Sequence, residues 1–580
     1  MKRTLFLCLA LFLLLTACTQ QTQTLPTVPT VETEPELTQE TPQEASAVEA
    51  FGLAYLPAYG LNPFQCTATV NRALFSLLYE SLFVVSNQFR AEPVLCESFK
   101  VSDEGKTYTF TLVSGVTFSD GTPLTADDVA ASVEAARQSP IYSSRLSHIS
   151  YYTVNEDGTF SVFLDTPYEN FALMLDVPIV KANTVDSRTP IGSGSYCLRG
   201  TKLQKNAQWK QLTSPILTAE TIPLTSCADP GELRDSFEFG TTDLVYCDPN
   251  SPAAVGYRCD YEVWEAPTTV MHYLGFNLYS GYFVNDKLRA AVTLALDRED
   301  ISNKVYGGFA QASVLPCSPY SDLYDTQLAE AYDYAPAAFS AAVKENGVTT
   351  STDYVGYVGT LLVCSEDPKR VAAADYIAAV LQEAGLHITV NAVDYDSYQT
   401  ALRNGNFDLY YGEVRLTANF DLSEFFEENG NLQYGFIASG GLSALCLASL
   451  ENSGSFSELC AQLMQQAPIC PVVFKGYAIY VTRGAISSVT PAVDYVFHNA
   501  STARTLADAD QTYADTAPVE PPAESTDTTD ETDSTTDAPP VESSETPYPP
   551  CRAGMSPPYT GCIVYHGAFS RVDCEADGCT

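Results

Sequence analysis

Strand-like and helix-like segments alternate along residues 360–410. Short apolar runs of strand length are separated by longer segments in which apolar side chains recur at helical spacing. Asp367-Pro368 is a typical helix start, and Gly385 and Gly405 are typical helix ends. In chain order the predicted elements are a strand at 360–364, a helix from Asp367 to Gly385, a strand at 387–393, a helix at 395–402 and a strand at 407–410. This succession predicts a mainly parallel sheet covered by helices.

The N-terminal third has the pattern of an antiparallel sheet. Residues 107–112 alternate between threonine and apolar side chains, and turn residues lie on both sides of them, at 103–106 and 119–122. The predicted elements are this strand, a helix that starts at Thr125 and runs to about Arg137, and a hairpin at 152–164 around Asp157-Gly158. A mixed lobe and a parallel α/β lobe together predict an α/β fold of two lobes, with a ligand cleft between them.

The first 18 residues carry the features of an export signal. Lys2 and Arg3 precede an apolar run at 5–15, and Leu15-Thr16-Ala17-Cys18 follows it. The run of about eleven residues is too short for a membrane span, which needs about twenty. The segment resembles a bacterial lipoprotein signal, which implies a signal peptide at 1–17 and a lipid on Cys18, the first residue of the mature chain. The alternative is an uncleaved anchor.

Two segments of low complexity flank the central body. Residues 18–49 and 508–549 are rich in Thr, Pro and acidic residues and almost lack aromatic ones, which predicts a disordered stalk and a disordered acidic linker. They leave a body at about 50–507 and a C-terminal island at 550–580 with four cysteines. With 30 basic and 71 acidic residues, the formal charge is −41. This charge disfavours a nucleic-acid partner.

The cysteines and histidines show no metal or redox motif. Of 17 cysteines, Cys8 leaves with the signal and Cys18 takes the lipid, so fifteen remain, eleven in the body and four in the C-terminal island. None is spaced C-x-x-C, and the five histidines are isolated, so we expect neither a metal nor a cofactor. Buried apolar cysteines are favoured over partial disulfide formation. His272 and His387 are interpreted as core or edge residues.

Several motifs of the body resemble those of the family 5 extracellular solute-binding proteins, the oligopeptide- and nickel-type receptors of ABC importers. The most specific is the long block from Ser102 to Val129, which contains Ser102-Asp103-Glu104-Gly105-Lys106 and Phe118-Ser119-Asp120-Gly121-Thr122-Pro123. The other matching segments, in the expected order, are 61–82, 190–196, 274–277, 287–298 and 466–471. The likeness covers nearly all of residues 50–500.

The resemblance implies a two-lobed periplasmic-binding-protein-like fold of type II, similar to cluster C, with mixed sheets, a hinge and an interlobe cleft. It implies an N-terminal lobe with an inserted subdomain at 50–270, a second α/β lobe at 271–490, and a return segment to the first lobe at 491–507. Family members close on a ligand and pass it to a membrane permease, and they perform no covalent chemistry.

Ligand-binding candidates come from the segment 411–426. In peptide-binding relatives this region carries a tryptophan and two aspartates, one of which pairs with the amino terminus of the peptide. Here the tryptophan is missing, Asp421 best matches the second aspartate, and Ala418 or Asn419 replaces the first. Asp421 is a candidate for an α-ammonium, and Arg415 for a bidentate contact to a carboxylate. The alternative for each is a structural cap or a surface ion pair.

Two further asparagines lie in shared motifs of the family. Asn62 and Asn277 are ligand candidates, although shaping a loop or hinge is at least as well supported.

Three functions stay open at this point. The leading one is a monomeric, lipid-anchored binding protein of an ABC importer for oligopeptides. It would lie on the outer face of a bacterial membrane, at the cell surface or in a periplasm. A nickel-chelate ligand is less favoured because histidine is scarce. The second is a surface receptor for another small solute that feeds a sensor. The third is an enzyme, which the lack of a G-x-S-x-G, H-E-x-x-H or phosphate-loop motif disfavours.

Overall fold

The computed structural model describes residues 51–498, except 214–216, 218, 255, 347–357, 429, 437–439 and 487–488, together with the backbone of 563–566. Outside the described residues lie the predicted signal peptide, Cys18, the stalk and the acidic linker. The part of the return segment beyond residue 498 and most of the C-terminal island lie outside them too. The described residues belong to one compact unit. Among the described residues, no helix combines the length and hydrophobicity that a membrane crossing needs.

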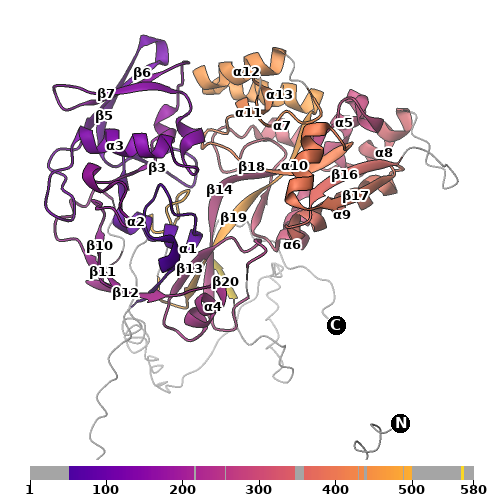
Figure 1. Ribbon diagram of the computed structural model, residues 1–580. Helices are drawn as coiled ribbons and strands as arrows, with labels where there is room; N and C mark the ends of the chain where they lie inside the picture. Colours follow the sequence, from indigo (N-terminus) through magenta and orange to yellow (C-terminus); the bar gives the residue numbers. More distant parts are fainter. Residues whose placement is uncertain are drawn as a thin grey trace, which may run out of the picture. The chain divides into compact units, whose positions relative to one another are not determined.

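Two long strands, β14 (Tyr261–Phe276) and β19 (Ile469–Thr482), pair with each other in antiparallel fashion and continue through both lobes (Figure 1). They are buried along almost their whole length, as expected for strands covered on both faces. The described strands of the main sheet follow the order β10-β11-β12-β1-β13-β19-β14-β18-β16-β17, with β15 beside β19 and β20 (Ile563–His566) beside β14. The pair β14–β19 is therefore the hinge of the molecule.

The first lobe uses one half of this sheet. Its strands are β1 (Leu53–Tyr55), β10 (Tyr196–Arg199), β11 (Lys202–Lys205), β12 (Thr221–Ser226) and β13 (Leu244–Cys247). Its helices are α1 (Thr69–Arg72), α2 (Phe75–Leu78) and α4 (Pro230–Glu238). Within the described residues, β1 pairs in parallel with β12 and β13, whereas β13 pairs with β19 in antiparallel fashion, so the sheet is mixed.

An inserted subdomain holds a separate antiparallel sheet in the order β5-β6-β8-β7. Its elements are β5 (Cys96–Ser102), β6 (Thr107–Leu112), α3 (Ala126–Arg137), β7 (Ile149–Val154) and β8 (Phe160–Leu164). Short pairs lie beside it: β2 (Glu80–Ser81) with β9 (Pro178–Ile179), and β3 (Phe83–Val85) with β4 (Ala91–Pro93). The predicted strand, helix and hairpin are confirmed, and Thr125 and Asp128 form a capping box at the start of α3.

The second lobe contains the predicted parallel sheet. Its strands are β15 (Ala310–Ala312), β16 (Gly359–Cys364), β17 (Ile388–Val393) and β18 (Leu409–Arg415). Its helices are α5 (Asp286–Val292), α6 (Arg298–Tyr306), α7 (Thr326–Ala331), α8 (Pro336–Glu345), α9 (Pro368–Glu383), α10 (Tyr395–Asn404), α11 (Ser423–Phe426), α12 (Gly440–Glu451) and α13 (Phe456–Gln466). Strand β16 pairs in parallel with β17 and β18, which confirms the predicted topology.

Strand β18 extends further than the sequence predicts. The prediction ended it at residue 410, but it continues to Arg415 because β14 pairs with it over seven residues. The extension carries Glu413 and Arg415 into the hinge region. The turn residue Gly405 has a positive φ of 66°, which ends α10 as predicted.

The hinge strands are irregular where they pass from one lobe to the other. The register of β14 against β19 shifts between Pro267 and Met271. Thr268 donates its hydroxyl to the Lys475 carbonyl at 2.6 Å, and Thr269 donates to the Leu416 carbonyl at 2.6 Å. The two hydroxyls therefore satisfy backbone acceptors where the strand ladder is interrupted.

The eleven cysteines of the described body are free thiols. Eight of them are buried, which agrees with the prediction of buried apolar cysteines for those eight. Burial raises the pKa of several of these thiols, for example that of Cys96 to about 11, so they stay protonated and unreactive at neutral pH.

Candidate functional site

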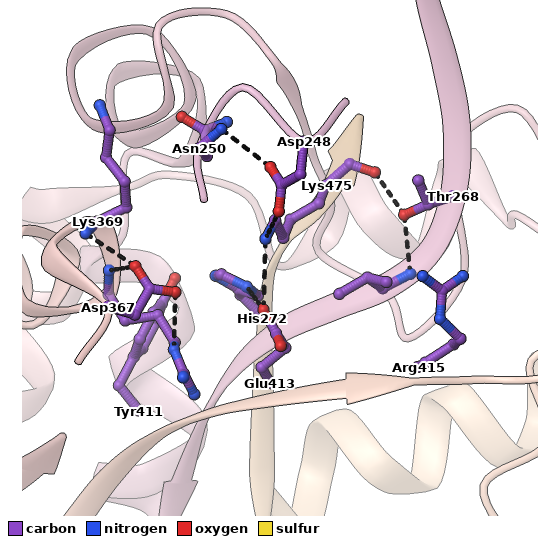
Figure 2. Close-up of polar contacts among 12 residues, drawn as sticks. Asp248, Asn250, Thr268, His272, Asp367, Lys369, Tyr411, Glu413, Arg415 and Lys475 are labelled. Carbon is purple, nitrogen blue, oxygen red and sulfur yellow. Dashed lines mark hydrogen bonds and ion pairs between the residues drawn. The ribbon is translucent and has the colours of Figure 1, made fainter. Parts of the chain in front are cut away.

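Four charged or polar side chains meet at the hinge, and we call them the hinge network: Asp248, His272, Glu413 and Lys475 (Figure 2). Lys475 on β19 places its Nζ 2.5 Å from Asp248, which follows β13, and 3.5 Å from Glu413 on β18. His272 on β14 lies with Nε2 2.7 Å from Glu413 and Nδ1 2.7 Å from the Tyr306 hydroxyl. The network therefore links the first lobe, both hinge strands and the second lobe.

Burial and charge act in opposite directions on these groups. Burial would raise the pKa of Glu413, but His272, Lys475 and Arg370 outweigh it and hold this pKa well below its usual range. Burial lowers the pKa of His272, so its neutral ring donates from Nε2 to Glu413 and accepts at Nδ1. Burial would also lower the pKa of Lys475, but Asp248 and Glu413 raise it. The network thus holds two carboxylates and one ammonium.

The start of α9 adds a second charged group beside the network. The Asp367 side chain caps the helix by accepting from the amides of Lys369 and Arg370, and Arg370 Nε donates to its other oxygen at 3.0 Å. Since β16 ends just before this cap, the group lies at the carboxyl end of a parallel strand, where α/β proteins commonly bind ligands.

Arg415 ends β18 on the same face as Glu413. Its Nη2 donates to the Tyr477 hydroxyl at 3.3 Å, and the Tyr477 ring lies 5.5 Å from that of Tyr246 in the first lobe. Arg415 is exposed, and it has no ion pair with any carboxylate of the described residues. Its guanidinium is therefore available to an external anion.

A buried ion group lies near Arg415 in the first lobe. Asp494 accepts from Arg72 at 2.9 Å and from Arg145 at 3.0 Å, and Arg145 also donates to Asp176 at 2.5 Å. Burial would raise the pKa of Asp494, but Arg72, Arg415 and Arg145 hold it well below its usual range. Three guanidinium groups thus act on Asp494, and one of them, that of Arg145, also pairs with Asp176.

A cavity of about 320 Å³ opens beside Arg415, and we call it the cleft cavity. One wall comes from the first lobe and the other from the second. The lining side chains that can carry charge are His148, Asp165, Arg415, Asp421, Glu424, Glu427 and Glu428. The structure therefore brings Arg415 and Asp421, both predicted from the sequence, to one interlobe cavity.

Asp421 already has partners in this cavity. Its Oδ1 accepts from the backbone amide and hydroxyl of Ser423 at 2.9 and 2.6 Å, and its Oδ2 lies 3.8 Å from Nε2 of His148. His148 belongs to the first lobe, and its Nδ1 lies 3.2 Å from Asp165. The nearby carboxylates of Asp421 and Asp165 outweigh burial and raise the pKa of His148 to about 9. Asp421 therefore forms a cross-lobe ion pair with a protonated imidazole.

The three predicted asparagines are engaged in the fold. Asn419 accepts from the hydroxyls of Tyr168 at 3.0 Å and Thr417 at 2.7 Å, so it joins the two lobes. Asn62 donates to carbonyls of the 185–187 loop at 2.7 and 2.8 Å. Asn277 donates to carbonyls of the 405–407 loop at 3.1 and 3.0 Å. Asn62 and Asn277 hold loops, and a ligand contact by any of the three stays a prediction.

Sequence reasoning missed the partners that give the site its charge. His148, Asp248 and Lys475 lie in no motif, and no local spacing joins them to Asp421 or Glu413. His272 is a core residue as interpreted, with no exposed side-chain surface, but its bond to Glu413 depends on strand register. Among the described residues, no group of three His, Cys, Asp or Glu side chains is arranged to hold a metal ion.

Replacing Lys475 by Ala should lower the free energy of unfolding by about 3 kcal/mol, because it leaves Asp248 and Glu413 close together without their shared cation. The measurement is urea unfolding followed by circular dichroism. Lys304→Ala is the matched control, since Lys304 pairs with Asp300 at 2.9 Å but is 70% exposed, and we expect a change under about 1 kcal/mol. Equal losses in both variants would contradict a special role for the hinge network.

The stability contributed by His148 should depend on pH. Because its pKa is raised from 6.5 to about 9, its contribution is fully present below about pH 6.5 and is lost as the pH rises to about 9. The difference in melting temperature between the native chain and His148→Gln should therefore shrink across this interval. His387→Gln is the matched control. A difference that stays constant from pH 6.5 to 9 would show that the ion pair with Asp421 does not stabilise the fold.

Comparison with known proteins agrees with this architecture. Residues 90–430 match the model of the bacterial extracellular solute-binding proteins, family 5 Middle. The glutathione-binding protein GsiB of Salmonella typhi is 24% identical over 356 residues, which cover 58% of this chain and 67% of that protein.

Two solved structures share the fold. NikA from Brucella suis, in complex with Fe(III)-EDTA, aligns with a TM-score of 0.62 and 17% identity, covering 78% of this chain and 99% of that one. The oligopeptide-binding protein AppA from Bacillus subtilis, in complex with a nonapeptide, aligns with a TM-score of 0.51 and 19% identity, covering 75% and 94%. The chain therefore belongs to the family 5 bacterial extracellular solute-binding proteins, the substrate-binding components of ABC transporters, which bind solutes and are not enzymes.

Proposed function

We propose that this protein captures oligopeptides by closure of its two lobes and delivers them to the permease of an ABC importer. It acts as a monomer on the extracytoplasmic face of a bacterial membrane, to which a lipid on Cys18 anchors it. The segment 18–49 joins the binding body to this anchor, and tethering raises the effective concentration of the body near the permease.

The observation that carries the proposal is the guanidinium of Arg415 in the cleft cavity. It lies between the lobes, donates to one tyrosine and has no ion pair with a described carboxylate. A planar guanidinium forms two parallel hydrogen bonds to a carboxylate, so Arg415 suits the carboxylate of a peptide. Asp421 is the proposed second contact, to the α-ammonium, in competition with His148.

The ligands named for similar proteins support a carboxylate-bearing solute. Glutathione, a nonapeptide and Fe(III)-EDTA all carry carboxylates, and the first two are peptides. A metal chelate is the second candidate, because NikA shares the fold and a chelate would use the same guanidinium. Binding of Fe(III)-EDTA with no binding of peptides would favour this second candidate.

The first experiment is native mass spectrometry of residues 45–508, purified without denaturation, followed by release and identification of the bound molecules. A mixture of short peptides supports the proposal. An empty protein that also ignores a peptide library in a thermal-shift screen contradicts the peptide assignment. Loss of peptide uptake in cells without the protein separates an importer from a receptor that feeds a sensor.

Arg415→Ala should weaken peptide binding by about 10- to 100-fold, the usual contribution of a charge-assisted hydrogen bond. Calorimetry with a peptide and its C-terminally amidated form makes the test specific. The amidated peptide lacks the carboxylate, so it should bind the native chain weakly, and its affinity should fall little further in Arg415→Ala. Arg403→Ala, an exposed arginine at the end of α10, is the matched control. If Arg415→Ala and Arg403→Ala bind equally well, Arg415 does not hold the ligand.

Cys18→Ser should release the protein from the membrane, because a serine cannot receive the thioether-linked lipid. Fractionation of cells that express either form, followed by immunoblotting, measures the effect. At least nine-tenths of the native chain should sediment with membranes, while the variant should be soluble or remain unprocessed. Equal membrane association of a processed variant would show that Cys18 is not the anchor.

A further inference from the structure

A second cavity of about 570 Å³ lies between the inserted subdomain and the second lobe, and we call it the aromatic chamber. The subdomain side includes Phe83, Phe89 and Phe99 from strands β3 and β5 and the turn between β3 and β4. The second-lobe side includes Ala418 and residues 321–323. Its volume falls within the range of small-molecule sites, about 300 to 1,000 Å³.

Aromatic rings give the chamber an apolar wall, in which Phe99 is exposed while Phe83 and Phe89 are buried. Phe99 is 43% exposed although it lies in a strand, and its ring contacts Phe83 edge-on at 5.8 Å and stacks on Tyr108 at 6.0 Å. Phe89 packs against Phe420 of the second lobe at 4.9 Å. Packing fixes these rings, so the chamber offers preformed aromatic faces that attract apolar groups and cations.

The charges of the lining are mainly negative. Its arginine, Arg90, is held by Asp322 through two hydrogen bonds of 2.5 and 2.8 Å. Glu97 has no ion pair with any cation of the described residues, and Glu169 accepts from the Ser453 amide at 2.7 Å without a cationic partner in the same part of the chain. The cation of the lining is therefore neutralised, whereas two carboxylates keep their charge.

The chamber is distinct from the cleft cavity. The segment 417–421 separates them: Ala418 lines the chamber, while Thr417 and Asp421 line the cleft cavity. Between the two, Asn419 accepts from the Tyr168 hydroxyl of the first lobe, and Phe420 packs on Phe89. A ligand in the chamber would thus be held without Arg415.

We propose that the aromatic chamber is a second binding site, for a small organic cation with an aromatic or apolar body and a primary ammonium group. The body lies against Phe83, Phe89 and Phe99, and the ammonium pairs with Glu97 and Glu169. This inference goes beyond the proposed peptide site, because it uses a different cavity and needs no carboxylate on the ligand.

The test uses three probes that share one ring: 2-phenylethylamine, 3-phenylpropionate and 2-phenylethanol. Their binding to the full-length protein is measured by saturation-transfer NMR and calorimetry. We expect the amine to bind at least tenfold more tightly than the carboxylate, with the alcohol between them. Equal affinities for amine and carboxylate, or no binding of the amine at 10 mM, would overturn the proposal.

Variants then locate the probe. Glu97→Gln should reduce the preference for the amine about tenfold, and Phe99→Ala should weaken the binding of all three probes. Both side chains are exposed, so the variants should fold, which circular dichroism checks. Asp421→Asn should lose peptide affinity but keep its affinity for the amine, because Asp421 lines the cleft cavity and not the chamber. If the amine is lost in Asp421→Asn and kept in Glu97→Gln, the amine binds in the cleft cavity and the chamber assignment is wrong. Peptide binding by the native chain is scored separately, so either proposal can fail alone.

Discussion

The antiparallel pairing of β14 with β19 is the constraint on which the rest of the structure depends. These two strands belong to the sheets of both lobes, since β13 extends the pair on one side and β18 on the other. Any change in the angle between the lobes must therefore be absorbed where their register shifts, between Pro267 and Met271. Lys475 lies next to this place and binds carboxylates from both sides, so the hinge network joins the two lobes through a single ammonium.

The contacts that join the lobes away from the hinge are of a different kind. His148 with Asp421, Tyr168 with Asn419, and Arg90 with Asp322 are polar pairs, and both side chains of the last pair are more than half exposed. Exposed ion pairs contribute only about 0 to 1 kcal/mol each. The exposed pair therefore contributes little, whereas the largely buried pairs His148–Asp421 and Tyr168–Asn419 and the packing of Phe89 on Phe420 hold the lobes together away from the hinge.

The sequence predicts the parts of the fold that depend on local pattern. The two strands and two helices between Gly359 and Gly405 follow from periodicity, a proline after an N-cap aspartate, and glycines at helix ends. The end of β18 does not follow from local pattern, because Glu413, Val414 and Arg415 become part of the strand only through their pairing with β14. Local sequence pattern therefore predicts which elements form, whereas strand pairing determines how long the strands are.

The candidate site could be predicted only in part, because local sequence pattern does not show which distant residues come into contact. Arg415 and Asp421 were found because they follow a strand in a segment that resembles a ligand-binding region of the family. Their partners were not, because Lys475 and Asp248 are 227 residues apart and His272 and Glu413 are 141 apart. No rule on the spacing of residues in the sequence applies to separations of this length. The charge of a binding site made by two lobes is a property of the folded chain, since each charge is cancelled or left free by a residue from another part of the sequence.

The uncharged side chains of Ala418 and Asn419 have a physical consequence for the interlobe region. A carboxylate at this place would face the aromatic chamber or the Tyr168 hydroxyl, and it would need a cation there to offset its burial. With Asn419 the amide oxygen accepts two hydroxyl groups and needs no counter-charge. The negative charge of the region is carried instead by Asp421 on one side of the segment and by Glu97 and Glu169 on the other. The same short segment therefore separates two cavities between the lobes, one that contains Arg415 and one whose arginine, Arg90, is paired with Asp322.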